Sequence, residues 1–312
     1  MDYSRSYLEF KELLNKFKRI TIISHIRPDG DTISSALAIY NYLKIDGVTS
    51  ELVCANIPPI KYKFLKGFDK FKSKIGYSDS LVITLDCADL TRVSFNLDNR
   101  VIVNIDHHSS NNNFGTLNIV EVEVSTTVVL YKFLKEGFSI NKDIAECIYA
   151  GLISDSQNFT TTLTKKETFN IASELLEYGV DLVKVSNMVN KFNSLSHVRI
   201  LGKAIDSLML YSNAKIAVMI ITKEDVEATG ATFGDIDGII DVAASLATVE
   251  IAILITNFLG LIKVSLRSKN VDVSKVASIF GGGGHKMAAG FEVKDGKIEQ
   301  VKLDILKELK GI

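Results

Sequence analysis

The sequence predicts an α/β protein of two lobes, with a parallel sheet in the N-terminal lobe and a smaller α/β lobe after it. Its 312 residues are 46% hydrophobic, which is enough to bury the cores of two domains. Short, nearly unbroken apolar segments at 20–24, 81–85 and 101–105 are typical of parallel strands that are covered on both faces. Segments with helical periodicity lie between and after these strands, as expected when helices connect the strands of a sheet.

The first elements lead from a helix into a strand and a polar loop. Ser6 and Glu9 have the spacing of a capping box, and the apolar residues that follow at helical intervals predict an amphipathic first helix. After the strand at 20–24, residues 25–31 (HIRPDGD) interrupt the regular pattern with a proline and a glycine. Apolar residues at helical spacing over 33–43 then predict a second helix.

Two further strands end directly on ionisable residues. The strand at 81–85 ends on Asp86, and the strand at 101–105 ends on the triplet Asp106, His107 and His108. Helical periodicity follows at 125–136 and again at 142–153. The N-terminal lobe therefore carries polar residues at the ends of several buried strands.

The C-terminal part is predicted to be a connector followed by a second α/β lobe. Residues 181–211 have the periodicity of one or two helices. Beyond them the pattern predicts strands at 216–221, 249–256 and 261–266, a glycine cluster at 281–284, and a hairpin-like turn at Asp295 and Gly296. We place the N-terminal domain, the helical connector and the C-terminal domain at 1–185, 186–211 and 212–312.

The charge balance argues against a long nucleic-acid duplex or an anionic membrane surface as the main partner. The 36 lysines and arginines nearly balance 37 aspartates and glutamates, without a long run of like charges. The three cysteines are scattered and lack the spacing of zinc ligands, so we expect them to be reduced packing residues. Apolar runs are too short to span a membrane, and the N-terminal segment is charged and amphipathic. We expect a cytoplasmic protein, and the sequence leaves open whether it forms a homodimer.

Histidines and aspartates gather at the predicted C-terminal ends of the strands. Of the five histidines, His25, His107 and His108 lie at or just after such an end, together with Asp86. Residues at the carboxyl ends of parallel strands converge in space although they are distant in sequence. We therefore predict a metal site with the ligands His25, Asp29, Asp31, Asp86, His107 and Asp155.

Each aspartate taken alone has a simpler interpretation. Asp31 precedes a predicted helix and by itself fits a helix N-cap, and the other aspartates fit turns. Independent caps and turns, however, have no reason to place carboxylates and imidazoles at successive strand ends. A nitrogen and oxygen ligand set without thiolate suits manganese, and its large share of carboxylates also admits magnesium.

Three neighbouring residues have roles that the sequence does not decide. Asp106 is a candidate hydrogen-bond partner for the second ring nitrogen of a ligating histidine. Thr126 and Thr127 either line the site or simply start a helix.

These motifs resemble the DHH phosphoesterase superfamily, which is named for the triplet found here at 106–108. Four motifs of that family's N-terminal domain occur in order, namely SHIRPDGD at 24–31, LDCAD at 85–89, DHH, and GLISDS at 151–156. The segments IKVSLRS at 262–268 and VASIFGGGGHKMAAG at 276–290 resemble the family's DHHA1 domain. The likeness covers nearly the whole chain, and no ligand position is replaced.

The resemblance implies two divalent cations per chain and an active cleft between the two lobes. One cation would be bound by His25, Asp29 and Asp86, and the other by Asp31, Asp86, His107 and Asp155. Asp86 would then bridge the two cations. The likeness further implies that His108, with Asp106, acts as a catalytic residue and contacts the substrate phosphate.

The second lobe offers a candidate phosphate site. The glycine run, followed by His285 and an expected short helix, would present backbone N–H groups to an anion, and Arg267 would add a bidentate contact. The alternatives are a flexible turn, a packing or capping histidine and an ordinary surface arginine. With the family likeness we predict substrate binding by Arg267, Ser268, Gly282, Gly283, Gly284 and His285.

The cation pair implies hydrolysis by water that the two cations activate, without a covalent intermediate. The lack of a GxSxG nucleophile motif and of a Walker loop agrees with this reaction. Family II pyrophosphatases carry a different C-terminal domain and RecJ-type exonucleases are longer, so the chain resembles the compact NrnA-type branch. We therefore expect hydrolysis of short oligonucleotides or dinucleotides to mononucleotides, of pAp to AMP and phosphate, or of both. A phosphodiesterase for cyclic or linear diadenylates and a non-catalytic nucleotide-binding or RNA-binding module are the alternatives.

Overall fold

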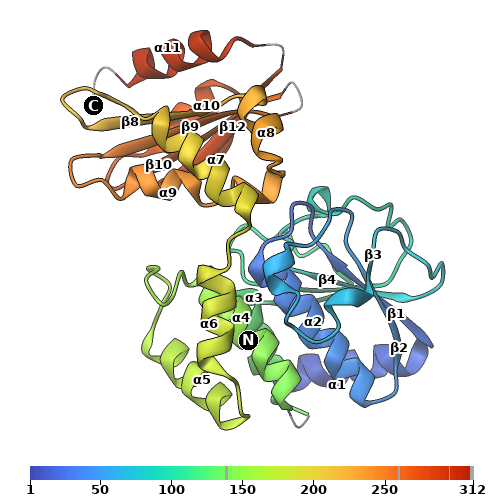
Figure 1. The fold of residues 1–312 in the computed structure, drawn as a ribbon. Helices are drawn as coiled ribbons and strands as arrows, with labels where there is room; N and C mark the ends of the chain where they lie inside the picture. Colours follow the sequence, from blue (N-terminus) through green and yellow to red (C-terminus); the bar gives the residue numbers. More distant parts are fainter. Residues whose placement is uncertain (138–139, 259–260, 295, 310–312) are drawn as a thin grey trace. The chain divides into compact units, whose positions relative to one another are not determined.

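The computed structural model describes residues 1–137, 140–258, 261–294 and 296–309. The chain forms two compact units, Met1–Phe192 and Asn193–Ile312, and each has its own sheet (Figure 1). Each unit also has its own buried apolar clusters. The predicted α/β class with two lobes is confirmed. Along the chain, the boundary between the units falls within the segment predicted as a connector, after α6 (Leu182–Lys191) and before α7 (Leu195–Asp206).

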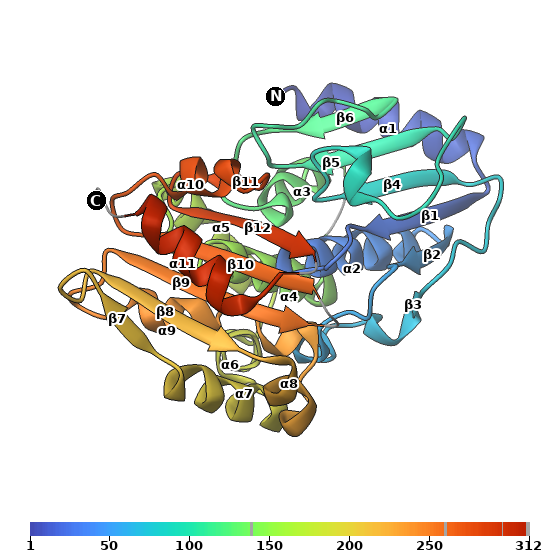
Figure 2. The same cartoon turned by 90° about the horizontal axis from the view of Figure 1, so that it is seen from above.

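The first unit is built on a six-stranded sheet in which each neighbouring pair of strands is parallel. The strand order is β3-β2-β1-β4-β5-β6 (Figure 2). The strands are β1 (Arg19–Ser24), β2 (Thr49–Val53), β3 (Phe71–Lys72), β4 (Leu81–Leu85), β5 (Ile102–Asp106) and β6 (Leu117–Val120). The predicted parallel sheet is thus confirmed. After β1 the chain continues to β2, toward one edge of the sheet, and after β4 it continues to β5, toward the other edge. This change of direction creates a topological switch point between β1 and β4.

Strands β2, β3 and β6 were not predicted from the sequence. β2 reads TSELV, and its Glu51 is only 3% exposed. The Glu51 carboxylate accepts hydrogen bonds from the Thr21 hydroxyl and from the backbone N–H groups of Gly76 and Tyr77. A buried acid is tolerated when it is hydrogen-bonded in this way, but it hides the strand from a hydrophobicity pattern.

The helices of the first unit are α1 (Tyr3–Lys16), α2 (Gly30–Ile45), α3 (Thr126–Leu134), α4 (Lys142–Asp155), α5 (Lys166–Glu177) and α6. Single 3₁₀ turns occur at Ile60–Tyr62, Phe68–Lys70 and Leu90–Arg92. The predicted capping box is wrong, because Ser6 and Glu9 lie inside α1. Asp2 is the N-cap instead, and its carboxylate accepts the Arg5 N–H at 3.0 Å.

The second unit contains a mixed six-stranded sheet in the order β11-β12-β10-β9-β8-β7. Its strands are β7 (Met209–Tyr211), β8 (Ile216–Ile221), β9 (Ile251–Phe258), β10 (Leu261–Ser268), β11 (Gly283–His285) and β12 (Ala288–Lys294). Its other elements are α8 (Lys223–Thr229), α9 (Ile239–Ala244), α10 (Val273–Ile279), α11 (Ile298–Glu308) and a 3₁₀ turn at Phe233–Asp235. In the described part of the chain, no helix is both long and apolar enough to pass through a bilayer.

Two local predictions for the second unit are corrected. The short helix expected directly after the glycine run is not formed: α10 precedes the run, and Gly283–His285 form β11, which pairs antiparallel with β12. The glycines therefore lie on the edge of a hairpin, not at a helix N-terminus. Of the predicted turn, Asp295 lies outside the described residues, and after Gly296 the chain enters α11 instead of a returning strand.

Candidate metal centre

The predicted metal ligands come from one edge of the parallel sheet. His25 follows β1, Asp86 follows β4 and His107 follows β5, each at the C-terminal end of its strand. These strands are consecutive neighbours in the sheet, and β1 and β4 flank the switch point. The loop before α2, the first turn of α2 and the last residue of α4 supply Asp29, Asp31 and Asp155.

The described residues contain three groups of carboxylate and imidazole side chains that can hold a metal ion. The groups are His25, Asp29 and Asp86; Asp31, His107 and Asp155; and Asp86, His107 and His108. Within each group the ligand atoms lie within 4.8 Å of one another. Every predicted ligand belongs to one of these groups, and Asp86 and His107 each belong to two. The fold therefore collects the predicted ligands into one cluster.

His25 provides the clearest indication that a cation fits. Its Nδ1 lies 2.7 Å from the Ile26 carbonyl oxygen, so Nδ1 carries a proton and Nε2 is the nitrogen that can bind a metal. Nε2 is fully buried and has no hydrogen-bond partner among the described residues, and it lies 3.2 Å from Asp86 Oδ2 and 3.6 Å from Asp29 Oδ2. A buried nitrogen without a partner beside two carboxylates suits a divalent cation.

His107 repeats this arrangement on the other side of Asp86. Its Nδ1 donates to the Glu123 carbonyl oxygen at 2.9 Å, which leaves Nε2 for a metal. Nε2 lies 3.5 Å from Asp86 Oδ1 and 3.5 Å from Asp155 Oδ2. The two oxygens of Asp86 therefore face two different histidines, as a bridging carboxylate requires.

The helix N-cap role that was considered for Asp31 belongs to Asp29 instead. Asp29 is the N-cap of α2, and its Oδ1 accepts the N–H groups of Asp31 and Thr32, each at 3.1 Å. Asp31 lies in the first turn of α2, but its carboxylate accepts N–H groups at the start of α3, from Thr126 at 2.6 Å and Thr127 at 3.1 Å. Asp31 is thus held by the end of a second helix.

Without a cation, the cluster holds protons that its residues would lose in water at neutral pH. Burial raises the pKa of Asp31 to about 7, with a further contribution from the charge of Asp86. Burial also raises the pKa of Asp155 to about 9, and the charge of Asp31 adds to this. Burial alone would lower the pKa of His107, but the surrounding carboxylates, Asp86 foremost, raise it to about 9. In the same way, Asp29 and Asp86 outweigh burial and raise the pKa of His25 to about 10.

Asp106 and His108 form a pair beside the cluster. The His108 Nδ1 donates to Asp106 Oδ1 at 2.8 Å, and Asn111 Nδ2 donates to Asp106 Oδ2 at 2.6 Å. Burial opposes ionisation of Asp106, but the bond from His108 and the positive charges nearby lower its pKa. Asp106 therefore contacts His108, and neither His25 nor His107 uses it as the partner of its Nδ1.

In the second unit, Arg267 lines a pocket of about 320 Å³ together with two glycines of the run at 281–284. Lys263 on the same strand and Asp237 line it as well, so two cationic side chains and one carboxylate border the pocket. The Arg267 Nε lies 3.5 Å from Asp241 Oδ1, and the Arg267 side chain is 39% exposed. Gly283 and Gly284 contribute the backbone of β11 to the same pocket.

The glycines of this run differ in what the fold demands of them. A side chain at Gly282 would collide with the Gly290 carbonyl oxygen, whereas a Cβ at Gly283 would meet nothing within 4 Å. Packing within the described residues therefore does not explain the glycine at 283. The remaining predicted residues do not line the pocket. Ser268 accepts the Val271 N–H at 2.7 Å in a turn, and His285 is exposed at the end of β11.

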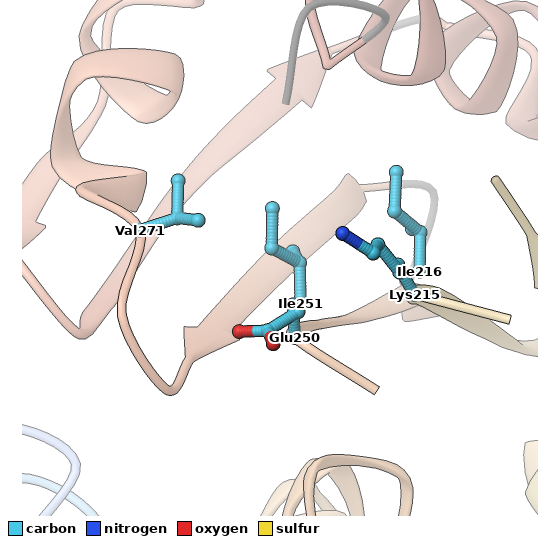
Figure 3. Close-up of a pocket in the computed structure, with 5 residues that line it drawn as sticks. All are labelled: Lys215, Ile216, Glu250, Ile251 and Val271. Carbon is cyan, nitrogen blue, oxygen red and sulfur yellow. The ribbon is translucent and has the colours of Figure 1, made fainter. Parts of the chain in front are cut away.

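A smaller pocket of about 140 Å³ lies where β8 and β9 begin (Figure 3). It is lined by Lys215, Ile216, Glu250, Ile251 and Val271. None of these residues was predicted to bind metal or substrate, and none of them belongs to a metal-binding group.

Family comparisons agree with the motifs and with the geometry. Residues 19–152 match the model of the DHH family, N-terminal domain, and residues 213–312 match the model of the DHHA1 domain. The chain belongs to the DHH family. The metal-binding groups thus lie in the DHH part of the chain or directly after it, and the Arg267 pocket lies in the DHHA1 domain.

The DHH relatives match over nearly their whole length. The bifunctional oligoribonuclease and PAP phosphatase NrnA of Thermus thermophilus is 28% identical over 93% of this chain and 89% of its own. The probable bifunctional oligoribonuclease and PAP phosphatase NrnA of Streptococcus mutans is 26% identical over 90% and 92%. Among solved structures, an exopolyphosphatase-related protein from Bacteroides fragilis matches with a TM-score of 0.87 and 26% identity over 98% of this chain and 97% of its own.

The DHH domain also contains site residues that the sequence did not identify. Arg92, the last residue of the 3₁₀ turn Leu90–Arg92, places a guanidinium nitrogen 3.1 Å from His25 Nδ1. Gly151 on α4 leaves room for the cluster, because a Cβ there would lie 2.8 Å from Asp31 Oδ1. Thr126, which the sequence left undecided, donates its hydroxyl to Asp86 Oδ1 at 2.9 Å. These contacts join residues that are far apart in the sequence, so no local pattern reveals them.

Proposed function

We propose that this DHH protein is a metal-dependent phosphodiesterase that hydrolyses short oligonucleotides or dinucleotides to mononucleotides and converts pAp to AMP and phosphate. The observation that carries the proposal is the cluster of carboxylates around two imidazole Nε2 atoms, one of which is buried without a hydrogen-bond partner. The activity named for the similar oligoribonuclease and PAP phosphatase proteins supports the choice of substrate.

Two divalent cations fit the ligand set, manganese best and magnesium as the alternative. We assign His25, Asp29 and Asp86 to one cation, and Asp31, Asp86, His107 and Asp155 to the other. The opposed oxygens of Asp86, one facing His25 and one facing His107, support its role as the shared ligand. When bound, such cations lower the pKa of water and offset the charge of a phosphate.

His108 is proposed to act on the substrate. Its Nδ1 donates to Asp106, so the ring is fixed and its Nε2 can exchange a proton or a hydrogen bond with a phosphate oxygen. The His108 side chain is 33% exposed, in contrast to His25 at 1%, and a ligand can therefore reach it. Asp106, completely buried and also held by Asn111, orients this histidine.

Substrate binding by the DHHA1 domain is proposed for Arg267, Gly283 and Gly284. The pocket that they line combines exposed glycine backbone with two cationic side chains, which outnumber the carboxylate of Asp237, and this suits a phosphate group. Ser268, Gly282 and His285 remain predicted contacts. A net charge of −1 favours a substrate with few phosphates over a long strand. Cytoplasmic location also remains a prediction, which the free, buried Cys54, Cys87 and Cys147 support.

The test is nucleotide release by purified protein with Mn²⁺, measured side by side on dinucleotides, 5-mer RNA, pAp and pApA. We expect release of mononucleotides from RNA and of phosphate from pAp, and loss of both with excess chelator. A matched variant, Asp79→Asn, changes a carboxylate that is 79% exposed and lies before β4, at the opposite end of that strand from Asp86, and should keep full activity. Turnover of none of these substrates with Mn²⁺ or Mg²⁺ would rule the proposal out.

A further inference from the structure

Thr126 is the first residue of α3, and it contacts two of the proposed metal ligands at once. Its hydroxyl donates to Asp86 Oδ1 at 2.9 Å, and its backbone N–H donates to Asp31 Oδ2 at 2.6 Å. The Thr127 N–H completes the contact with Asp31 Oδ1 at 3.1 Å. Thr126, Asp31 and Asp86 are all buried, with exposures of 0%, 1% and 3%.

The start of helix α3 does not by itself explain the Thr126 hydroxyl. Ser125 is the N-cap, and its hydroxyl accepts the Val128 N–H at 3.2 Å, as an N-cap residue does. The Thr126 hydroxyl therefore has no capping role to fill, and it points to the carboxylate of Asp86. Torsions about the Cβ–Cγ bond of aspartate are broad, so a carboxylate without such a contact can rotate.

We propose that Thr126 is a positioning residue for the metal pair, which fixes the carboxylate of Asp86 so that each of its oxygens faces one cation. The inference rests on the proposed function for the assignment of the ligands. With Oδ1 held by Thr126, Oδ2 remains 3.2 Å from His25 Nε2 and Oδ1 faces His107. The same end of α3 holds Asp31, so one helix terminus aligns ligands of both cations.

Close packing of α4 keeps this helix end in place. A Cβ at Gly151 would lie 2.8 Å from both Asp31 Oδ1 and Thr127 Oγ1. The side chains of Asp31 and Thr127 therefore fill the space between α4 and the start of α3 and leave no room for a side chain at position 151. Residues that hold metal ligands in this way typically change metal affinity or activity by about 10- to 100-fold when they are replaced.

The experiment compares Thr126→Val and Thr126→Ser with a control threonine. Thr21 matches Thr126 closely, because it is 0% exposed and its hydroxyl donates to a buried carboxylate, that of Glu51, at 3.1 Å. Thr21 lies within β1 and touches none of the ligands. Mn²⁺ affinity is measured by titration calorimetry, stability by thermal unfolding without metal, and kcat and KM with pAp at saturating Mn²⁺.

We expect Thr126→Val to weaken Mn²⁺ binding by about 10- to 100-fold and to lower kcat, with KM unchanged because the side chain touches no substrate. Thr126→Ser should restore binding to within about threefold, since it keeps the hydroxyl. Thr21→Val should lower the unfolding temperature but keep the Mn²⁺ affinity of the parent. If Thr126→Val does not fold, Thr126→Ala replaces it in the same comparison.

Mn²⁺ affinity and kcat within twofold of the parent in a folded Thr126→Val variant would overturn the inference. An equal loss of affinity in Thr21→Val would overturn it too, because the effect would then be one of general stability. Metal titration decides the inference independently of turnover. A parent that binds Mn²⁺ but hydrolyses no nucleotide would refute the proposed function alone, whereas a parent that binds no Mn²⁺ would refute both.

Discussion

At the scale of single residues, Asp86 combines a rare backbone conformation with the central place in the cluster. Its φ of 59° lies in the left-handed region, which is unfavourable by about 1–2 kcal/mol for most residues and somewhat less for aspartate. The Asp86 N–H donates to the Ile105 carbonyl oxygen at 3.0 Å, which anchors this conformation to the end of β5. Strain of this kind is retained mainly at functional sites, where the surrounding structure enforces it.

Gly283 permits a prediction about substrate binding that is separate from stability. Because a Cβ at Gly283 meets nothing within 4 Å, Gly283→Ala should leave the unfolding temperature unchanged. If substrate phosphate approaches this backbone, the added methyl group should raise KM for pAp by about tenfold, equivalent to about 1.4 kcal/mol. The measurement is steady-state kinetics with thermal unfolding of the same samples.

Gly202 provides the control, since a Cβ there also meets nothing within 4 Å and the residue lies in helix α7. Gly202→Ala should stabilise the protein by about 0.5–1 kcal/mol, because alanine favours helix, and should leave KM unchanged. An unchanged KM in Gly283→Ala would remove this glycine from the substrate site.

The prediction of single residues succeeded where an ionisable side chain directly follows an apolar strand. Asp86 and His107 are polar residues directly after apolar strands, so their convergence followed from the rule for parallel sheets. The partner of Asp106 could not be predicted in this way. Asp106 is followed directly by His107 and His108, and the sequence does not indicate which of them turns toward it. Thr126 was equally undecidable, since a helix start accounts for a threonine without any contact to a ligand.

At the scale of elements, Asp29 both starts helix α2 and belongs to a metal-binding group. Its Oδ1 accepts the N–H groups of Asp31 and Thr32, while its Oδ2 lies 3.6 Å from His25 Nε2. One carboxylate can thus cap a helix with one oxygen and bind a cation with the other. Negative charge at a helix N-terminus is also favourable for the helix dipole.

Two substitutions separate these roles of Asp29. Asparagine is as good an N-cap as aspartate, but alanine is not, so Asp29→Ala should be less stable than Asp29→Asn by about 1 kcal/mol without metal. Both variants lose the carboxylate and should bind Mn²⁺ at least about tenfold more weakly. Chemical unfolding and Mn²⁺ titration check the two effects, and equal stability of the two variants would contradict the capping role.

Element prediction failed where burial is polar or where a turn is unusual. β2 was not predicted because Glu51 interrupts its apolar pattern, although hydrogen bonds satisfy the buried carboxylate. The glycine run was expected to lead into a helix, but it forms a strand edge that pairs with β12. Glycine permits both conformations, so composition alone does not choose between them.

At the scale of the whole molecule, the cluster links stability to pH. Asp31, Asp155, His107 and His25 have pKa values of about 7, 9, 9 and 10 in the folded protein, all above their ordinary values. A raised pKa means that the folded state binds protons more tightly than the unfolded state does. The corresponding stability is present at low pH and is lost as pH rises through these values.

The metal-free protein should therefore lose at least about 1 kcal/mol of unfolding free energy between pH 6.5 and 9.5. Mn²⁺ displaces the same protons, so its affinity should rise over this range. At 100 times its dissociation constant, Mn²⁺ should restore about 2.7 kcal/mol. Urea unfolding with and without Mn²⁺ at several pH values tests this, and constant stability of the metal-free protein across the range would contradict it.

The account depends most on the pair of cations that share Asp86, and the direct measurement is the number of Mn²⁺ ions bound per chain. Equilibrium dialysis of the parent and of Asp86→Asn, each stripped with chelator and checked for folding, provides that number. We predict two Mn²⁺ per parent chain and no tightly bound Mn²⁺ in Asp86→Asn, since both ligand sets include this carboxylate. A parent that binds no Mn²⁺, or an Asp86→Asn variant that binds two with the affinity of the parent, would contradict the account.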